Sequence, residues 1–396
     1  MTHQILVFNS GSSSFKFSLF EQNNPEPILN GLAEQLGQTQ ASITIKYKQS
    51  KFKHNIANAD HKTAILFLLD QFKKLEINLD HIHAIGHRVV HGGEYFSDSV
   101  IIDDQVIHAL ENCSALAPLH NPANIEGIKI MQSIFQDTKQ IAVFDTAFHQ
   151  SLPSKAYLYA LPYQWYKQQG VRRYGFHGTS HKYVAQRAKE ILNLNDNHQI
   201  ITVHLGNGCS ASAIKDSKSI DTTMGMTPLE GLVMGTRCGD IDASILQFMQ
   251  QKMGWSLDEI TNKLNKASGL LGLSELSNDM RTLVEAKEKG HEQAGIAIDV
   301  FCFKLAKQIM ALATSLTSID ALIFTGGIGE NSSFIRSQVI QNLTLLGFKI
   351  DETLNKNPDK QTGRISSDQS TLCMVINTNE EWMIAQDCTR LTSTTL

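Results

Sequence analysis

Three short stretches rich in glycine and small polar residues could hold a group with many oxygen atoms. The first, NSGSSSFK, runs from Asn9 to Lys16 and offers backbone N–H groups, three consecutive hydroxyls and one ammonium. The second, HLGNGCSA, begins at His204, and the third, TGGIGENS, begins at Thr325. Backbone N–H groups, hydroxyls and an ammonium are the groups that bind polyphosphate. Together the three stretches predict a nucleotide in a cleft between two α/β halves.

Each stretch alone has a simpler explanation. A glycine- and serine-rich segment between two apolar runs is often a solvated hairpin turn. The Walker A motif needs a lysine directly after its second glycine, and Gly11 lacks the companion glycines of a dinucleotide-binding turn. A nucleotide is favoured because all three stretches follow apolar, strand-like runs. The third also precedes a helix whose N-terminus would attract an anion.

Further stretches concentrate charged and histidine side chains that do not resemble core residues. Arg88 lies in GHRVVHGGE, Asp145 ends the strand-like run of VFDTAFH, and Arg237 lies in TPLEGLVMGTRCGDID. His177 and His181, in RRYGFHGTSH, have the i, i+4 spacing of a zinc-binding helix. The helix is expected to begin only near residue 179 or 180, and the HExxH motif is absent. We therefore expect no zinc, and we expect His181 to bond locally.

Two adjacent glutamates near the C-terminus have different expected roles. Residues 378–381 fit a capping box, with Thr378 as the N-cap and Glu381 at the third helical position. Glu380 is then left free, and with Asp145 it is a candidate metal ligand. Carboxylates, water and phosphate oxygens form the usual shell of Mg²⁺. A purely structural role for Asp145, bonding nearby backbone N–H groups, stays open.

The hydrophobic pattern predicts alternating strands and helices that would position these side chains. Helices are expected at 64–75 and 122–135, and strands at 4–8, 15–20, 82–90, 141–144 and 199–205. The strand, glycine turn and strand of residues 4–20 recur from residue 199 onward. These two copies suggest a duplicated domain, although short hairpins also recur by chance. The expected fold class is therefore α/β, with a boundary near residue 148.

Length and composition exclude several classes of protein. A chain of 396 residues and 44.0 kDa is expected to form two or three domains. The formal net charge of −4 gives no reason to expect a nucleic acid partner. The N-terminal stretch lacks the features of a signal peptide, and no apolar run is long enough to cross a membrane. Six widely spaced cysteines without a CxxC pair indicate neither a zinc ribbon nor a disulfide framework, so a cytoplasmic location is expected.

Taken together, the motifs resemble those of the acetate kinase family. The resemblance runs from Asn9 to Asp387 and rests on a fixed order of words: NSGSSSFK, GHRVVHGG, APLHNPAN, FDTAFH, RRYGFHGTSH, HLGNG, TPLEGLVMGTRCGD, FTGGIGEN and TNEEW. It implies two duplicated actin-like (ribonuclease H-like) ATPase domains around a nucleotide cleft. Residues 1–148 would form the first domain, with a C-terminal helix at 383–396 packing back on it. Residues 149–382 would form the second, which would bind nucleotide and form a homodimer.

The resemblance also implies a reaction and a set of residues. ATP and acetate would give ADP and acetyl phosphate reversibly, by direct in-line transfer assisted by Mg²⁺, for which Mn²⁺ could substitute. The residues implied for catalysis and for support of the transition state are Arg88, His120, Asp145, His177 and Arg237. Those implied around the acid, together with Arg88, are Val90, Leu119, Phe176 and Pro228. Those implied for the metal are Asn9, Asp145 and Glu380. Those implied for the nucleotide are Asn9, Ser12, Lys16, His204, Gly206, Asn207, Gly208, Asp279, Arg281, Gly327, Ile328, Gly329 and Asn331.

The chemistry of acetate suits these residue types. Acetate is already an anion near pH 7, because its pKa is close to the value of about 4.3 for Glu, so no general base is needed. The difficulty is its repulsion from polyphosphate, about 4 kcal/mol for unit charges at roughly 4 Å and an effective dielectric of about 20. Arginine side chains offset this repulsion well, because their planar forks bond two oxygens at once.

Two other functions stay open. A propionate kinase carries nearly the same motifs, and one methylene is worth only about 1–3 kcal/mol of discrimination. Val90 narrows the implied acid pocket and favours acetate. A nucleotide-driven switch, as in actin or Hsp70, would need the glycine turns and metal carboxylates. It would not need Arg88, His177 and Arg237 together, so their presence favours an enzyme.

Overall fold

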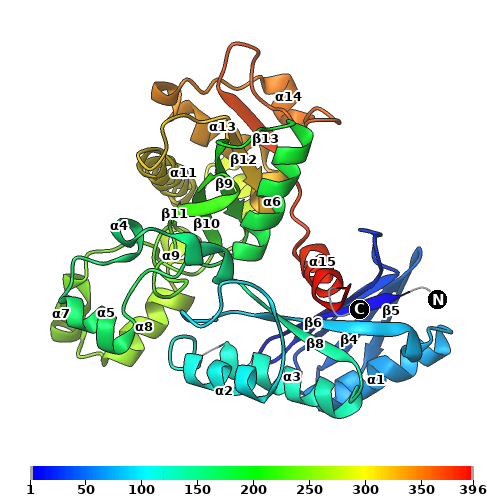
Figure 1. The fold of residues 1–396 in the computed structure, drawn as a ribbon. Coiled ribbons are helices and arrows are strands. Elements are labelled where there is room, and N and C mark those ends of the chain that lie inside the picture. The colour runs from blue at the N-terminus through cyan, green and yellow to red at the C-terminus, as the bar shows by residue number, and fades with distance from the viewer. Residues whose placement is uncertain (1–2, 119, 394–396) are drawn as a thin grey trace. The chain divides into compact units, whose positions relative to one another are not determined.

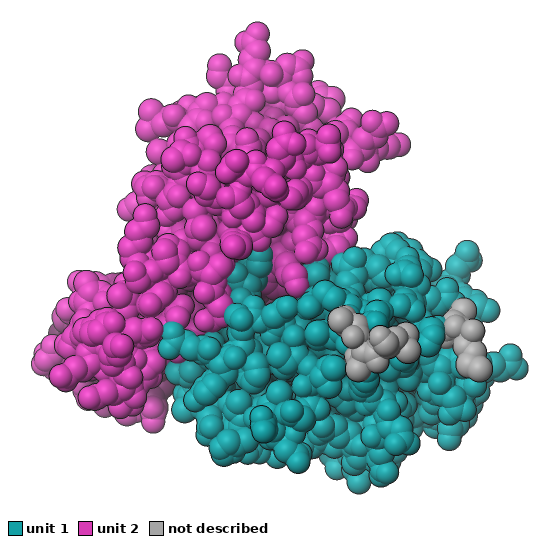
Figure 2. All heavy atoms as spheres, viewed as in Figure 1, with its two compact units in different colours: residues 1–148, 379–396 teal, residues 149–378 magenta. Residues whose placement is uncertain are grey.

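The computed structural model describes residues 3–118 and 120–393. The chain divides into two compact units (Figure 2): residues 1–148 with 379–396, and residues 149–378. Within the described residues no helix has the length and hydropathy that a bilayer span requires. Leu119, expected near the acid, lies outside the described residues.

The first unit is built on an eight-stranded sheet with the order β5-β4-β3-β2-β1-β6-β8-β7. Its strands are β1 Gln4–Ser10, β2 Phe15–Glu21, β3 Leu29–Glu34, β4 Ser42–Tyr47, β5 Ser50–Asn55, β6 Ile82–Val89, β7 Val100–Ile101 and β8 Lys139–Phe144. Its helices are α1 His61–Lys74, α2 Asp104–Cys113, α3 Asn121–Ile134 and α15 Glu380–Ser393, with a 3₁₀ turn at Leu79–His81.

Helices cover both faces of this sheet (Figure 1), with α1, α2 and α3 on one side and α15 on the other. Leu6 and Phe8 of β1 pack in the core under α1 and α3. Ile5 and Val7 point to the opposite face and pack against α15. A strand buried on both faces reads as a continuous apolar run, which is why the sequence predicts β1 so clearly.

The second unit has a five-stranded sheet with the order β11-β10-β9-β12-β13. Its strands are β9 Gln199–Leu205, β10 Cys209–Lys215, β11 Lys218–Thr222, β12 Ala321–Thr325 and β13 Leu372–Val375. Its helices are α4 Ser154–Tyr157, α5 Tyr163–Gln169, α6 Gly178–Ile191, α7 Ser244–Met253, α8 Leu257–Lys266, α9 Gly269–Ser274, α10 Met280–Glu288, α11 Glu292–Ala313, α12 Gly326–Asn331, α13 Ser333–Gln341 and α14 Glu352–Lys356. Short 3₁₀ turns lie at Ala147–Ser151, where the two units meet in sequence, and at Thr344–Leu346.

The two sheets share one plan. In the first unit β3, β2 and β1 are antiparallel neighbours, and β1, β6 and β8 continue as parallel neighbours. In the second unit β11, β10 and β9 are antiparallel, and β9, β12 and β13 are parallel. The order and the directions therefore agree strand by strand. The duplicated α/β fold that the sequence predicted is confirmed.

The expected start of the last helix is wrong. Helix α15 begins at Glu380, three residues before position 383. The Oδ1 atom of Asn379 accepts a hydrogen bond from the backbone N–H of Trp382 at 3.0 Å, so Asn379 is the N-cap. The predicted capping box with Thr378 and Glu381 is therefore not formed. Glu381 accepts a bond from the Ser18 hydroxyl at 2.7 Å instead, so its role is structural, but for a different reason.

Candidate active site

The first glycine-rich stretch forms the hairpin between β1 and β2. Asn9 pairs with Lys16 across the two strands, which places both side chains beside the turn. The Gly11 N–H donates to the Ser14 carbonyl at 2.7 Å, and the Gly11 carbonyl contacts Nε2 of His61 at 2.7 Å. These bonds fix the turn from inside and from α1. The Ser12 and Lys16 side chains are exposed, as groups that bind an external anion must be.

Arg88 and Asp145 meet at the carboxyl ends of the parallel strands β6 and β8. Arg88 Nε donates to Asp145 Oδ1 at 2.9 Å, and Nη2 donates to Oδ2 at 2.7 Å. The Asp145 side chain is 2 % exposed and that of Arg88 is 25 % exposed. The carboxylate of Asp145 raises the pKa of Arg88, with a smaller contribution from Glu380. Both oxygens of Asp145 therefore orient Arg88, a role that the sequence did not reveal.

The other predicted residues of the first unit lie on the same edge or at a helix start. Val90 directly follows β6, and its backbone N–H donates to Oδ1 of Asn124 on α3 at 3.1 Å. His120 is the N-cap residue of α3 and its side chain is exposed. No group of three or more His, Cys, Asp or Glu side chains suited to a metal occurs among the described residues.

The second glycine-rich stretch is the turn between β9 and β10, where two predicted side chains converge. A Cβ atom on Gly208 would lie 2.5 Å from Nη2 of Arg237 and 3.3 Å from Nε2 of His177. The turn is closed by a bond from the Gly206 N–H to the Gly208 carbonyl at 3.0 Å. Only glycine fits here, because any side chain would displace the guanidinium. Residues 177, 208 and 237, far apart in sequence, thus form one cluster.

Arg237 is a half-buried cation whose guanidinium is held by a backbone carbonyl. Its Nη1 donates to the Pro228 carbonyl at 2.6 Å. Burial lowers the pKa of its guanidinium, and no carboxylate pairs with it within the described part of the chain. A desolvated positive charge without a carboxylate attracts an anion strongly. The site therefore favours a phosphoryl group or another anion beside Gly208.

His177 lies just before α6 in a left-handed conformation with a φ of 56°. As predicted, it stays outside the helix, which begins at Gly178. Its Nδ1 contacts the Ser210 hydroxyl at 2.9 Å, and its ring stacks on His204 with centroids 4.4 Å apart. Phe176 is fully buried. His181 contacts the hydroxyls of Thr202 and Ser210, which confirms the local bonding that the sequence predicted for it.

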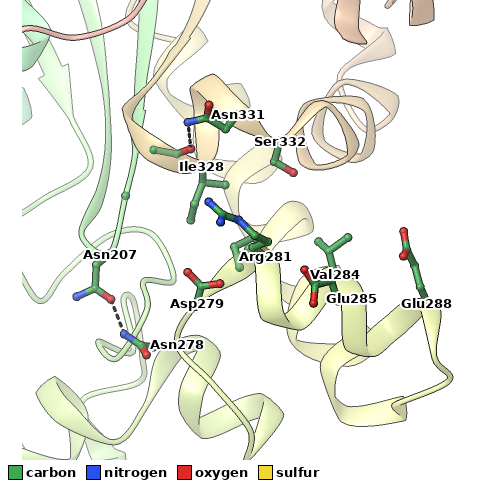
Figure 3. Close-up of a pocket in the computed structure, with 13 residues that line it drawn as sticks. Asn207, Asn278, Asp279, Arg281, Val284, Glu285, Glu288, Ile328, Asn331 and Ser332 are labelled. Carbon is green, nitrogen blue, oxygen red and sulfur yellow. Dashed lines mark hydrogen bonds between the residues drawn. The ribbon is translucent and has the colours of Figure 1, made fainter. Parts of the chain in front are cut away.

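A pocket of about 490 Å³ lies next to the second turn (Figure 3). In Figure 3 the side chains of Arg281 and Ile328 point towards one another within it. The predicted nucleotide residues that line it are Gly206, Asn207, Asp279, Arg281, Gly327, Ile328 and Asn331. The lining residues that sequence reasoning missed are Asn278, Met280, Val284, Glu285, Glu288 and Ser332. For the four of these on α10, namely Met280, Val284, Glu285 and Glu288, helical periodicity was the available signal, because residues four apart share one helix face.

Two lining residues are also tied into the local structure. Asp279 is the N-cap of α10 and accepts from the Thr282 N–H at 2.9 Å, a bond that lowers its pKa. Asn278 donates to Oδ1 of Asn207 at 3.0 Å and so links α10 to the glycine turn. This bond fixes the start of α10 relative to the glycine turn, and both contribute residues to the pocket lining.

The third glycine-rich stretch itself forms a short helix, α12, where a turn was expected. Glu330 folds back and accepts from the Gly326 N–H at 2.9 Å, which caps the helix start. At the other end Arg336 donates to the carbonyls of Gly329 and Glu330 at 2.8 and 2.9 Å. Arg336 is only 2 % exposed, and burial lowers its pKa to about 10. This arginine, which sequence reasoning missed, fixes the wall formed by Gly327 and Ile328. Gly329 is buried and is not among the residues that line the pocket.

Residues 4–386 match the acetokinase family. The chain belongs to the acetokinase family. It is 48 % identical over 98 % of its length to an acetate kinase of Shewanella woodyi, which it covers to 98 %. An acetate kinase of Chromobacterium violaceum is 49 % identical, with 99 % of both chains covered. These likenesses also identify the chain as a kinase enzyme.

Solved structures of the family have the same fold. A propionate kinase of Francisella tularensis superposes with a TM-score of 0.94 at 47 % identity, and an acetate kinase of Porphyromonas gingivalis with 0.94 at 40 % identity. Each is covered completely by 98 % of this chain. The match confirms the fold that the acetokinase motifs implied, including the two related units.

Proposed function

We propose that this chain transfers the γ-phosphoryl group of ATP reversibly to acetate, giving acetyl phosphate and ADP. The convergence of Arg237 and His177 on Gly208, beside the pocket at Asn207, carries this proposal. A nucleoside in that pocket would have its phosphates along residues 206–208. Its terminal phosphoryl would then reach one cation and one imidazole, which suit the charge that develops during transfer.

Arg88 is assigned to the carboxylate of acetate. Its two bonds to Asp145 use Nε and Nη2 and fix the plane of the guanidinium, while Nη1 makes no hydrogen bond to another described residue. A cation held in this way offsets the repulsion between two anions without a proton transfer. Val90, two residues further along the chain, is assigned to the methyl group, with Phe176 and Pro228. His120 and His204 are assigned to the surroundings of the reacting groups.

The side chains of the first unit fit Mg²⁺. Glu380 is half-buried, and no hydrogen bond or ion pair is recorded for its carboxylate in the described part of the chain. Glu380 and the Asn9 amide oxygen would hold the ion, with Asp145 as a further carboxylate. The ion would neutralise charge on the phosphate oxygens. Changing Glu380 to Gln should raise the magnesium concentration that gives half-maximal activity, whereas Glu381→Gln should not.

A hydroxylamine trap for acyl phosphate tests the function directly. Purified protein with ATP, Mg²⁺ and acetate should form acetyl hydroxamate, and ADP should appear in equal amount. Omitting acetate is the control, since a nucleotide switch would hydrolyse ATP without it. Acetate-independent hydrolysis with no hydroxamate would contradict the proposal.

Acetate is preferred over propionate in this proposal. The curated relatives named here are acetate kinases at 48 % and 49 % identity, although one similar structure is a propionate kinase at 47 %. The same trap with propionate measures the preference. A higher kcat/KM for propionate than for acetate would reverse the assignment.

A homodimer and a cytoplasmic location complete the proposal. The support for a dimer is a set of exposed apolar side chains on the second unit: Tyr163 and Trp165 of α5, Ile245, Phe248 and Met253 of α7, and Leu257 of α8. Large exposed apolar patches often mark the surfaces through which proteins bind one another. The support for a cytoplasmic location is that all six cysteines have free thiols, as is usual in a reducing compartment.

A further inference from the structure

Four side chains of the second unit form a buried hydrogen-bonded chain that ends at His177. Thr202 Oγ1 contacts Nδ1 of His181 at 2.7 Å, and Nε2 of His181 contacts Ser210 Oγ at 2.8 Å. The same Ser210 hydroxyl contacts Nδ1 of His177 at 2.9 Å. Thr202, His181 and Ser210 are each 0 % exposed. The chain therefore runs from β9 through α6 and β10 to the residue beside the glycine turn.

The direction of these bonds follows from counting protons. A hydroxyl donates one proton, and a neutral imidazole donates through one nitrogen and accepts through the other. Complete burial keeps His181 neutral and holds its pKa well below the ordinary value. Two directions are then possible along the chain, and they leave His177 in opposite tautomers.

Only one direction satisfies every donor. If Thr202 donates to Nδ1 of His181, Nε2–H of His181 donates to Ser210, and Ser210 donates to Nδ1 of His177, each proton has an acceptor. In the reverse direction the Thr202 hydroxyl proton has none, because no second hydrogen bond is recorded for this hydroxyl within residues 3–118 and 120–393. A buried donor without an acceptor is costly, so the first direction is favoured.

We propose that Thr202, His181 and Ser210 are positioning residues that hold neutral His177 in the tautomer with its proton on Nε2. His177 then presents a donor where a Cβ on Gly208 would lie 3.3 Å from Nε2. The opposite tautomer would present a lone pair, which repels a phosphoryl oxygen. This assignment rests on the proposed function for its consequence in catalysis, but the tautomer itself is independent of it.

A parallel contact holds the ring that stacks on His177. Ser180 Oγ contacts Nδ1 of His204 at 2.8 Å and Thr378 Oγ1 at 2.8 Å. Both imidazoles thus have Nδ1 against a serine hydroxyl, and Nε2 of His204 lies 3.7 Å from the Cβ position of Gly206. The stack limits rotation of His177 about its own axis, so the proton on Nε2 keeps its direction.

Nitrogen NMR on protein labelled with ¹⁵N-histidine tests the tautomer without any assay of activity. The spectrum of His177→Asn identifies the signals of His177 by their absence. At neutral pH the wild-type protein should show His177 with a protonated Nε2 and a bare Nδ1. A protonated Nδ1, or an imidazolium protonated on both nitrogens, would overturn the proposal whether or not the protein is a kinase.

A variant at the hydroxyl that contacts His177 tests the relay. Ser210→Ala removes the donor to Nδ1 of His177, so the preference for one tautomer is lost and a population of His177 with Nδ1–H should appear. In Thr202→Val the wild-type tautomer should persist, because reversing the chain would bury the Nδ1–H of His181 without an acceptor.

Turnover should fall about tenfold in Ser210→Ala with the KM for ATP within about twofold, the pattern of a lost transition-state donor. Ser366→Ala is the matched control, because Ser366 is an equally buried serine whose hydroxyl accepts from the Cys373 N–H instead. A folded Ser210→Ala protein with an unchanged His177 tautomer would overturn the relay.

Discussion

Arg88 and Arg237 experience opposite electrostatic environments. The pKa of Arg88 is raised by the Asp145 carboxylate, whereas burial without a carboxylate lowers that of Arg237. Arg88 is paired with a carboxylate that fixes its orientation. Arg237 has no such carboxylate, so we expect an anionic ligand to pair with it. Sequence motifs predicted both arginines for the same site, but they could not distinguish these environments, because pairing depends on which strand ends lie side by side.

The two arginines should therefore respond differently to truncation. Arg237→Ala should lower turnover by at least about a hundredfold, from loss of a charge-assisted clamp, while leaving the free energy of unfolding unchanged or slightly higher. Arg88→Ala should lower turnover as much and also destabilise the fold, because it leaves the buried carboxylate of Asp145 without its cationic partner. Breaking a buried pair costs about 3–5 kcal/mol, and partial exposure of Arg88 places this pair near or below the lower value. Steady-state kinetics and denaturant titration of both variants decide it. Equal stability losses would contradict the distinction.

At the scale of single elements, the glycine turns and the helix starts were predicted with unequal success. The turn at 206–208 was predicted because glycine is required where a side chain would collide. The start of α15 was not, because Glu381 three residues after Thr378 favoured a capping box there, although Asn379 is itself a good N-cap residue. The structure selects Asn379 since Thr378 is already engaged, its N–H by Glu330 and its hydroxyl by Ser180. Such competition for a side chain cannot be read from spacing.

The turn at Gly208 offers a sharp test of the cluster. In Gly208→Ala the new Cβ would lie 2.5 Å from Nη2 of Arg237, so the guanidinium must move and turnover should fall by about a hundredfold or more. Gly295→Ala on α11 is the control, since its Cβ would have ordinary contacts of 3.9 Å or more. That change should leave turnover unaltered and stabilise the helix by about 0.5–1 kcal/mol. Turnover close to that of the wild type in Gly208→Ala would show that this turn is not part of the active site.

The cap of α15 can be located by hydrogen exchange. Asn379→Ala should speed exchange of the Trp382 N–H and lower the free energy of unfolding by about 1 kcal/mol, since this proton loses its acceptor. Asn379→Asp keeps an acceptor oxygen and should retain slow exchange. If Thr378→Ala speeds exchange at the helix start and Asn379→Ala does not, the cap is the one that the sequence pattern favoured.

At the scale of the whole molecule, the duplication was the most predictable feature. The sequence predicted it from two segments in which a strand, a glycine turn and a second strand follow one another. Such segments are easy to recognise, because strands covered on both faces are apolar throughout and glycine turns separate them clearly. Each unit also buries histidines, among them His87 in the first and His181 in the second. Burial could not be predicted for either, as both lie in polar-looking motifs.

These buried histidines should make the molecule sensitive to acid. Burial lowers the pKa of His87 to about 4, against the opposing hydrogen bond to Gln140. Between the ordinary value near 6.5 and about 4, the unfolded chain binds this proton and the folded chain does not, so stability falls as pH falls. Melting temperatures from pH 7 to 4 should fall less steeply in His87→Gln than in wild type. The exposed His108→Gln should keep the wild-type slope. An unchanged slope in His87→Gln would contradict the effect.

The apolar surface of the second unit predicts assembly. Helices α7 and α8 pack on one another, and Phe248 and Leu257 on them are 61 % and 58 % exposed. Exposed apolar side chains on adjoining helices would be covered in a dimer, and a carboxylate buried there would be costly.

Light scattering should give twice the 44.0 kDa of one chain for the wild-type protein. The double change Phe248→Glu and Leu257→Glu should give the monomer, with the fold intact by circular dichroism. Leu345→Glu is the control, because Leu345 is 87 % exposed on a separate 3₁₀ turn and its change should leave the dimer in place. If the double variant is still a dimer, the interface lies elsewhere on the molecule. If the wild-type protein is a monomer, the proposed dimer is wrong.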